Sequence, residues 1–238
     1  MIRTAGSRGT ARTYWAAGSA VGLALLFAVG ATVATAGGAD SAASSRAPGL
    51  YSADAGFARD MAVHHQQAVE MSFIVRDRTK DEPVRGLAYD IANTQANQRG
   101  MLLGWLDLWG LPKVVADEPP MSWMGTGGGH GTAGMEGMAG HDMGGAVTKP
   151  GALMPGMATK EELDRLGSAE GRDAEVLYLR LMTEHHKGGV AMAQGCATLC
   201  GTPAERALAQ GMVAAQQSEI ALMADMLKQR GAEPAPSG

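Results

Sequence analysis

The chain has 238 residues and a formal net charge of −4; it is poor in aromatic residues (5%) but rich in glycine (34) and methionine (16). This length is enough for one domain or two small ones. The few aromatic residues argue against a β-sandwich, and the absence of a basic stripe argues against a nucleic-acid partner.

The N-terminal segment, residues 1–36, has the pattern of a targeting sequence. Arg3, Arg8 and Arg12 precede an uncharged apolar run over residues 15–36. Small residues at the end of the run resemble a signal peptidase site, but the run is also long enough to span a bilayer. A cleaved signal peptide and a retained membrane anchor therefore both stay open. Either one predicts an extracytoplasmic location: secreted, periplasmic, or anchored at the cell membrane with the C-terminal domain outside.

After a linker at residues 37–53, the chain contains a repeat. The segment "FARDMAVHHQQAVEM" begins at Phe57, and "YLRLMTEHHKGGVAM" begins at Tyr178. The offset of 121 residues that relates the two His-His pairs holds without a gap as far as Gly110 and Gly231. Such a register indicates two copies of one structural unit, residues 54–112 and 159–231.

Each copy is predicted to be a helical hairpin. Steps of three and four residues mark one face of the first helix, at Phe57, Met61, His64, Ala68, Met71 and Val75. Asp54 is the predicted N-cap of this helix, and "KDEP" at residues 80–83 separates it from a second helix over 84–109. "CGTPAE" forms the corresponding turn of the second copy. Two hairpins predict an all-α fold, an antiparallel four-helix bundle.

The segment between the copies, residues 113–158, is rich in glycine, methionine and histidine, and it is predicted to be a low-complexity linker. A short helix should follow, with Thr159 and Glu162 forming a capping box. Residues 232–238 are predicted to be a disordered tail.

The pattern Met-x2-His-His-x5-Met occurs in both copies. Thioether and imidazole ligands together suit copper, Cu(I) above all, better than oxygen-seeking metals. Neighbouring helical residues point about 100° apart, so one histidine of each pair is expected to face the bundle axis. His64 and His185 lie on the apolar stripe, and His65 and His186 are assigned to the rim or to a supporting role. Methionines at this spacing are also common core residues.

The linker contributes further soft ligands. Met-x2-Met units recur, and histidine stands close to methionine in "HGTAGMEGMAGHDM". A glycine-rich segment has no core for these side chains to fill, so the tract is interpreted either as a flexible copper collector or as compositional drift. Its candidate ligands, weaker than those of the hairpins, are His130, Met135, Met138, His141 and Met143.

A di-iron centre and a cysteine site are two other candidate sites. A di-iron centre needs Glu-x-x-His on two helices, and this pattern is missing from the chain. Cys196 and Cys200 favour a disulfide at a helix end outside the cytoplasm, with a thiolate metal pair as the alternative.

Gln95 and Gln216 repeat between the copies. They are assigned to hydrogen-bond the histidines, to bond each other, or to pack.

These features resemble the DUF305 family, a domain of unknown function. The resemblance rests on "DMAVHHQQAVEM", "MPGMATKEELDRL", "YLRLMTEHHKGGVAMA" and "QQSEIALM". It implies a ferritin-like four-helix fold and, from some members, an extracytoplasmic copper-binding protein tied to copper tolerance. The implied ligands are Met61, His64, His65, Met71, Met154, Met157, Met182, His185, His186 and Met192.

The sequence therefore predicts a protein that binds copper, as Cu(I) or Cu(II), for buffering, transfer or tolerance. Its partners would be the metal ion, other copper-handling proteins and, if the N-terminal segment is retained, the membrane. The first alternative is a metal-dependent oxidase that uses the same residues, and the second is a metal-free structural or interaction bundle. An enzyme is less favoured than a binding protein.

Overall fold

The computed structural model describes residues 47–116, 118–125 and 148–233. Within these ranges the order is α1 (Ala53–Arg78), α2 (Glu82–Trp109), the 3-10 turn η1 (Ser122–Met124), α3 (Lys160–Ser168), α4 (Gly171–Leu199) and α5 (Pro203–Gln229). The predicted all-α class is confirmed. The N-terminal segment, residues 126–147 of the predicted linker and most of the C-terminal tail lie outside the described residues, whereas residues 118–125 and 148–158 of the linker are described.

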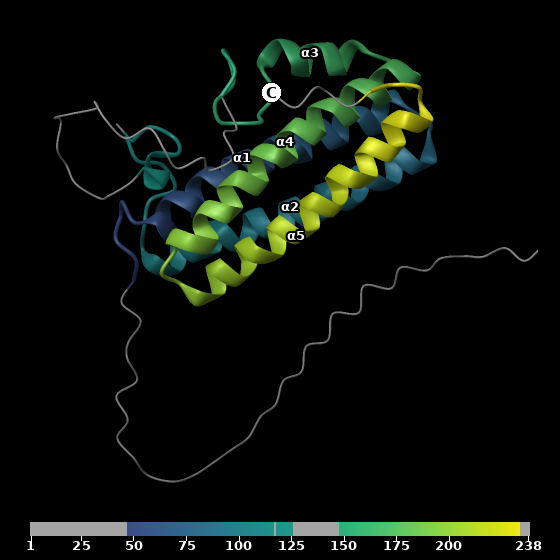
Figure 1. The fold of residues 1–238 in the computed structure, drawn as a ribbon. Helices are drawn as coiled ribbons and strands as arrows, with labels where there is room; N and C mark the ends of the chain where they lie inside the picture. The colour runs from purple at the N-terminus through teal and green to yellow at the C-terminus, as the bar shows by residue number, and fades with distance from the viewer. Residues whose placement is uncertain (1–46, 117, 126–147, 234–238) are drawn as a thin grey trace, which may run out of the picture. The chain divides into compact units, whose positions relative to one another are not determined.

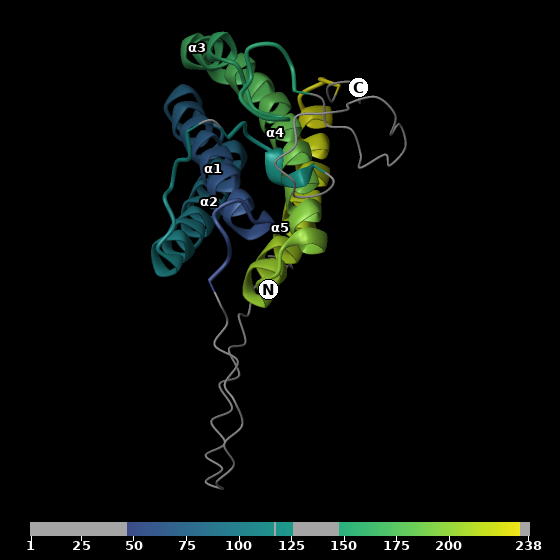
Figure 2. The same cartoon turned by 90° about the vertical axis from the view of Figure 1, so that its left-hand side faces the viewer.

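The four long helices form two hairpins (Figure 1). Helix α1 packs along α2 and α4 along α5, while contact between α1 and α4 joins the hairpins. In the perpendicular view, α1 and α2 lie on one side and α4 and α5 on the other, with the short α3 beside one end of α4 (Figure 2). The two histidine-bearing helices, α1 and α4, are thus in direct contact.

Local sequence explains where the helices begin and end. Asp81 caps α2 by accepting a hydrogen bond from the Val84 amide, a proline occupies the first turn, and Gly110 ends the helix in the left-handed conformation. The predicted capping box of Thr159 and Glu162 is confirmed at α3. The prediction that Asp54 caps α1 is wrong, because the Ser52 hydroxyl accepts the bond from the Ala55 amide.

Asp54 instead ties the start of α1 to the distant α4–α5 turn. Its carboxylate accepts hydrogen bonds from the amides of Gly201 (2.9 Å) and Thr202 (2.6 Å). At the other end of the bundle, Arg230 after α5 pairs with Glu175 and Asp81, each at 2.7 Å. The two hairpins are therefore joined by polar contacts at both ends.

The core divides into two apolar clusters. One includes Met61 of α1 and Met192 of α4, and the other includes Met71 of α1 and Met182 of α4. Because the His-His pair stands between the two methionines on each helix, the histidines occupy the layer between the clusters. The middle of the bundle is consequently polar although both neighbouring layers are apolar.

Candidate metal centre

His64 and His185 meet at the contact between α1 and α4. Both side chains are fully buried, and their ring centroids lie 3.8 Å apart with the planes tilted by 34°. His185 Nε2 is 3.0 Å from the His64 carbonyl oxygen, and His64 Nε2 is 3.3 Å from that of Pro155. A carbonyl only accepts, so Nε2 carries the proton in each ring and Nδ1 keeps its lone pair. The structure thus brings together the two histidines predicted to face the axis.

The second histidine of each pair is also buried, and its assignment to the bundle rim is wrong. His65 and His186 have no exposed surface. Each points toward the other helix of its own hairpin: His65 Nε2 is 2.9 Å from Gln98 Oε1 on α2, and His186 Nε2 is 2.7 Å from Glu219 Oε2 on α5. The supporting role predicted for these residues does not show in the geometry, because each ring has its own hydrogen-bond acceptor.

The four histidines share one feature. In each ring Nε2 faces an oxygen, while Nδ1 is buried without a hydrogen-bond partner among the described residues. A buried nitrogen lone pair with no donor is uncommon in native proteins and requires an explanation. Histidines that bind metals commonly donate their other N–H to a carbonyl, carboxylate or water in this way. The arrangement is the one expected of ligands oriented through Nε2.

Burial also fixes the charge of these rings. It lowers the pKa of His64 and of His65 to about 3, and it lowers the pKa of His185 well below its ordinary value. The neighbouring histidines lower these values further, while the oxygens at Nε2 act in the opposite direction. These three imidazoles are therefore neutral at neutral pH, the form that binds metals.

The methionines lie on both sides of the histidine layer rather than around one point. All six predicted methionine ligands are buried: Met61, Met154, Met157 and Met192 in one cluster, and Met71 and Met182 in the other. Apolar packing alone accounts for their burial. Their side chains lie in the apolar layers that flank the histidines, and the six are divided between two clusters.

The "MPGM" element closes the histidine layer from outside. Ala158 exchanges two hydrogen bonds with the Gln67 side chain of α1, at 2.7 and 2.9 Å. Pro155 lies so close to α4 that a Cβ atom on Gly188 would stand 2.1 Å from its carbonyl oxygen. The same carbonyl accepts the His64 bond. This element therefore orients one of the candidate ligands directly.

Sequence reasoning missed Gln98 and Glu219. Each stands 33 residues after its histidine, so the repeat contained the signal. The prediction for Gln95 and Gln216 as histidine partners is wrong: both are buried, and the Gln95 amide lacks a hydrogen-bond partner within the described ranges. Gln216 lies against Gly189 of α4.

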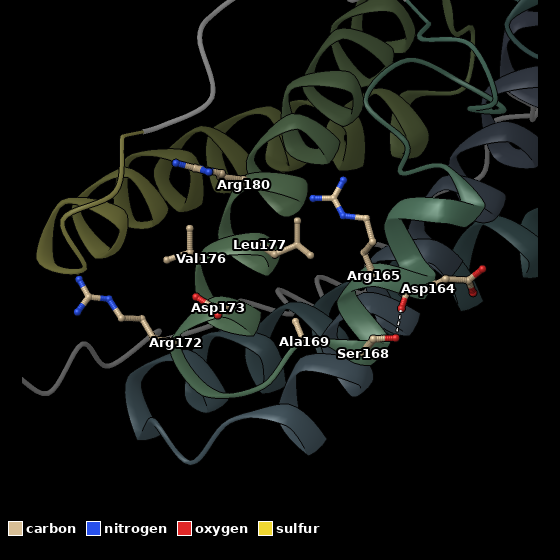
Figure 3. Close-up of a pocket in the computed structure, with 9 residues that line it drawn as sticks. All are labelled: Asp164, Arg165, Ser168, Ala169, Arg172, Asp173, Val176, Leu177 and Arg180. Atoms are coloured by element: carbon tan, nitrogen blue, oxygen red, sulfur yellow. Dashed lines mark hydrogen bonds between the residues drawn. The ribbon is translucent and has the colours of Figure 1, made fainter.

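Other predicted ligands are elsewhere or outside the described residues. His130, Met135, Met138, His141 and Met143 fall in the part of the chain that is not described. Cys196 and Cys200 form a disulfide. A surface groove of about 660 Å³ between α3 and α4 (Figure 3) includes Arg165, Arg172 and Arg180 but neither histidine nor methionine. The histidine layer is thus separate from this groove.

Fold and site define an all-α protein with two equivalent pairs of buried histidines. The family model described as "Domain of unknown function (DUF305)" matches residues 54–227, and the chain belongs to this family. No functionally curated protein matches it. Among the helices that the structure describes, none is long and apolar enough to cross a membrane.

Three solved structures are similar to the chain. A candidate secreted DUF305 protein from Streptomyces coelicolor has 58% identity and a TM-score of 0.66, over 79% of this chain and 99% of its own. A DUF305 fragment from Deinococcus radiodurans has 27% identity and a TM-score of 0.56, over 76% and 99%. CopM in its Cu(I)-bound form has 20% identity and a TM-score of 0.50, over 74% and 96%. At that identity the likeness to CopM concerns the fold.

Proposed function

We propose that this protein binds copper outside the cytoplasm, preferring Cu(I), and that it buffers the ion or passes it on. The observation that carries the proposal is the layer of four buried histidines whose Nδ1 atoms lack partners among the residues that the structure describes. Imidazole nitrogen next to thioether sulfur is a ligand set that suits Cu(I). The ions named for CopM agree with this choice of metal.

His64 and His185 are the central ligands in this proposal. Their rings are in contact, and because Nε2 of each ring faces a carbonyl oxygen, Nδ1 is the nitrogen left to bind an ion. His65 and His186 provide equivalent nitrogens in the two hairpins, and the buried methionines Met61, Met71, Met154, Met157, Met182 and Met192 provide sulfur on either side. The glycine-rich tract with His130, Met135, Met138, His141 and Met143 would collect the ion and raise the rate of loading.

The location rests on three features: the apolar N-terminal run, the disulfide, and the relative from Streptomyces coelicolor. Whether the N-terminal segment is cleaved or retained as an anchor does not alter the chemistry of the histidine layer. Other copper-handling proteins would be the donors or acceptors of the ion.

Competition with a chromogenic Cu(I) chelator tests the proposal. Changing both His64 and His185 to alanine should weaken Cu(I) binding at least about tenfold, since ligand-shell changes commonly cost that much. The matched control is Met101→Leu, because Met101 lies on the exposed side of α2 and is 43% exposed. Circular dichroism shows whether each variant is folded.

A folded double variant that binds Cu(I) as tightly as the wild type would contradict the proposal. Deletion of residues 121–145 should slow loading while leaving the final affinity within a few fold. Oxygen uptake, recorded in the same samples, separates buffering from a copper-dependent oxidase: turnover lost with His64 and His185 would favour the oxidase.

A further inference from the structure

A second group of ligand atoms lies at the α4–α5 turn, at the end of the bundle. Sulfur atoms of Cys196 and Cys200 and a carboxylate oxygen of Glu205 are all within 4.8 Å of one another. Within the described ranges this is the only group of three or more His, Cys, Asp or Glu side chains that come so close. The three residues belong to neither the histidine pairs nor the methionine motif.

Glu205 is the unusual member of this group. Its side chain has no exposed surface, and neither carboxyl oxygen accepts a hydrogen bond from a donor group within the described chain; its polar neighbour is the Asp54 carboxyl group, to which the protonated acid can donate. Burying a carboxyl group without a donor partner costs several kcal/mol when it is charged. Burial first, and then the nearby Asp54, raise the pKa of Glu205 to about 9. The group is therefore held as a neutral acid next to the disulfide.

The repeat shows that these residues replace ordinary core residues. At the offset of 121, Cys196, Cys200 and Glu205 correspond to Val75, Thr79 and Val84. Both valines are fully buried in the first hairpin. All three candidate ligands are thus departures from the repeat, and they occur together at one place.

The two ends of the bundle also differ in charge. Glu175, the repeat partner of Asp54, forms an ion pair with Arg230 at 2.7 Å. Asp54 accepts two amide hydrogen bonds, but neither it nor Glu205 forms an ion pair with a described residue. Two carboxyl groups therefore face each other here, while the cation of this turn, Arg206, donates to the carbonyl oxygens of Cys200 (2.7 Å) and Gly201 (2.8 Å) and forms no ion pair with either carboxyl group among the described residues. A bound divalent ion would bring positive charge directly to the carboxyl groups.

We propose that this cluster is a redox-gated metal site: when the disulfide is reduced, the Cys196 and Cys200 thiolates and the Glu205 carboxylate bind one thiophilic divalent ion of the Zn(II) class. Two sulfurs and one oxygen suit tetrahedral zinc and leave a fourth position open. A divalent ion balances this set of three negative ligands better than Cu(I), which has a single charge and prefers sulfur to oxygen.

The site forms in two steps, reduction of the disulfide and binding of the ion. A dithiol reductant transfers two electrons and two protons to the Cys196–Cys200 bond and becomes a disulfide itself, while the two cysteines become thiols. As the ion binds, two thiol protons and the proton of Glu205 pass to the solvent. A disulfide oxidant reverses the change: it takes two electrons from the two thiolates and two protons from the solvent to become a dithiol, the sulfur–sulfur bond forms again, Glu205 takes up a proton from the solvent, and the ion is released. The disulfide and the metal site are thus two states of the same residues.

The test compares oxidised and reduced full-length protein with Cd(II) alone as the probe. The chain has only two cysteines, so a thiol titration shows directly whether reduction is complete. Reduced protein is expected to bind one more equivalent of Cd(II) than oxidised protein and to gain a thiolate-to-metal charge-transfer band. The histidine layer is common to both states, so the difference isolates the second site. Failure of copper binding at the histidines would leave this result unchanged.

Two variants separate a built site from simple thiol binding. Glu205→Gln retains the shape of the neutral acid and should weaken Cd(II) binding to the reduced protein at least tenfold. The control Asp225→Asn removes an exposed carboxylate of the same helix and should bind as the wild type does. Equal binding by the oxidised and reduced proteins, or undiminished binding by Glu205→Gln, would overturn the proposal. The double variant with serine at both cysteines should show no band in either state.

Discussion

The two hairpins place their histidines alike but support them differently. His65 of the first hairpin faces the neutral amide of Gln98, and His186 of the second faces the carboxylate of Glu219. The "MPGM" element is held by the Gln67 side chain on α1, whereas on α4 it needs the bare backbone of Gly188. The repeat therefore preserves the buried histidines, whereas the residues around them differ: the second copy has the carboxyl group of Glu219 and the glycine that leaves room for the loop.

The largest expected effect comes from the buried histidines that both hairpins share. Because of them, the protein should lose stability in acid. The unfolded chain protonates its histidines near pH 6.5, but the folded protein protonates His64 and His65 only near pH 3. The unfolded state thus binds more protons between these values, so the free energy of unfolding falls as the pH drops from 6.5 toward 3. Each histidine contributes up to about 1.4 kcal/mol per pH unit.

Urea unfolding of metal-free protein at several pH values measures this slope. His65→Gln should reduce the slope by one proton, because a glutamine does not titrate. A free energy of unfolding that stays constant between pH 6.5 and 4 would show that the histidines are accessible to protons in the folded state.

The next effect concerns Gly188, whose counterpart in the first hairpin at the offset of 121 is Gln67. Gly188→Ala would place a Cβ atom against the Pro155 carbonyl, and relieving such an overlap costs about 1–3 kcal/mol. Gly211→Ala is the control on α5, since its Cβ would meet nothing within 4 Å, and it should stabilise the helix slightly. Thermal unfolding compares the two variants. Equal melting temperatures would mean that the element does not rest on α4.

The turns of the two hairpins can be made more alike. Glu205→Val places in α5 the residue that α2 has at Val84, and it removes a buried carboxyl group whose polar neighbour is the Asp54 carboxyl group. We expect the free energy of unfolding at neutral pH to rise by about 1–2 kcal/mol, the cost of a buried polar group that is poorly satisfied. The gain should grow as the pH rises toward 9, because the unfolded wild-type chain releases the Glu205 proton near pH 4.5 whereas the folded protein keeps it up to about pH 9, so the wild type loses stability over this range. Denaturant unfolding at pH 6 and 8 measures both quantities; a loss of stability at both would contradict the expectation.

The smallest expected effect is on the pKa of one histidine, when its hydrogen-bond partner is replaced. Gln98→Glu gives His65 the carboxylate partner that His186 has, and an opposite charge at hydrogen-bond distance should raise the pKa of His65 by about one unit or more. An NMR titration of the histidine ring protons follows this directly. The exposed Gln66 on α1 provides the control Gln66→Glu, which should leave the pKa nearly unchanged because water screens its charge.

Several elements of the molecule could be predicted from the sequence, for physical reasons. The gapless repeat, the turn residues around Pro83 and the capping box at Thr159 are local signals, and the structure contains the corresponding elements. His64 and His185 stand on the apolar stripes, so their contact follows once the stripes meet. The cap of α1 was mistaken because Ser52 and Asp54 are both good capping residues, and a contact with the α4–α5 turn decided between them.

The sequence by itself determined the all-α class, the two-copy organisation and the family, because helical periodicity and a fixed offset are properties of the chain alone. Only the tertiary structure decided that all four histidines are buried. Helices α1 and α4 each contact both their hairpin partner and the opposite hairpin, so two neighbouring residues that point in different directions can both reach an interface. Likewise, only folding places Glu205 beside Cys196 and Cys200 and brings Asp54 of α1 to Glu205, because these contacts depend on distances in space and not on a pattern in the sequence.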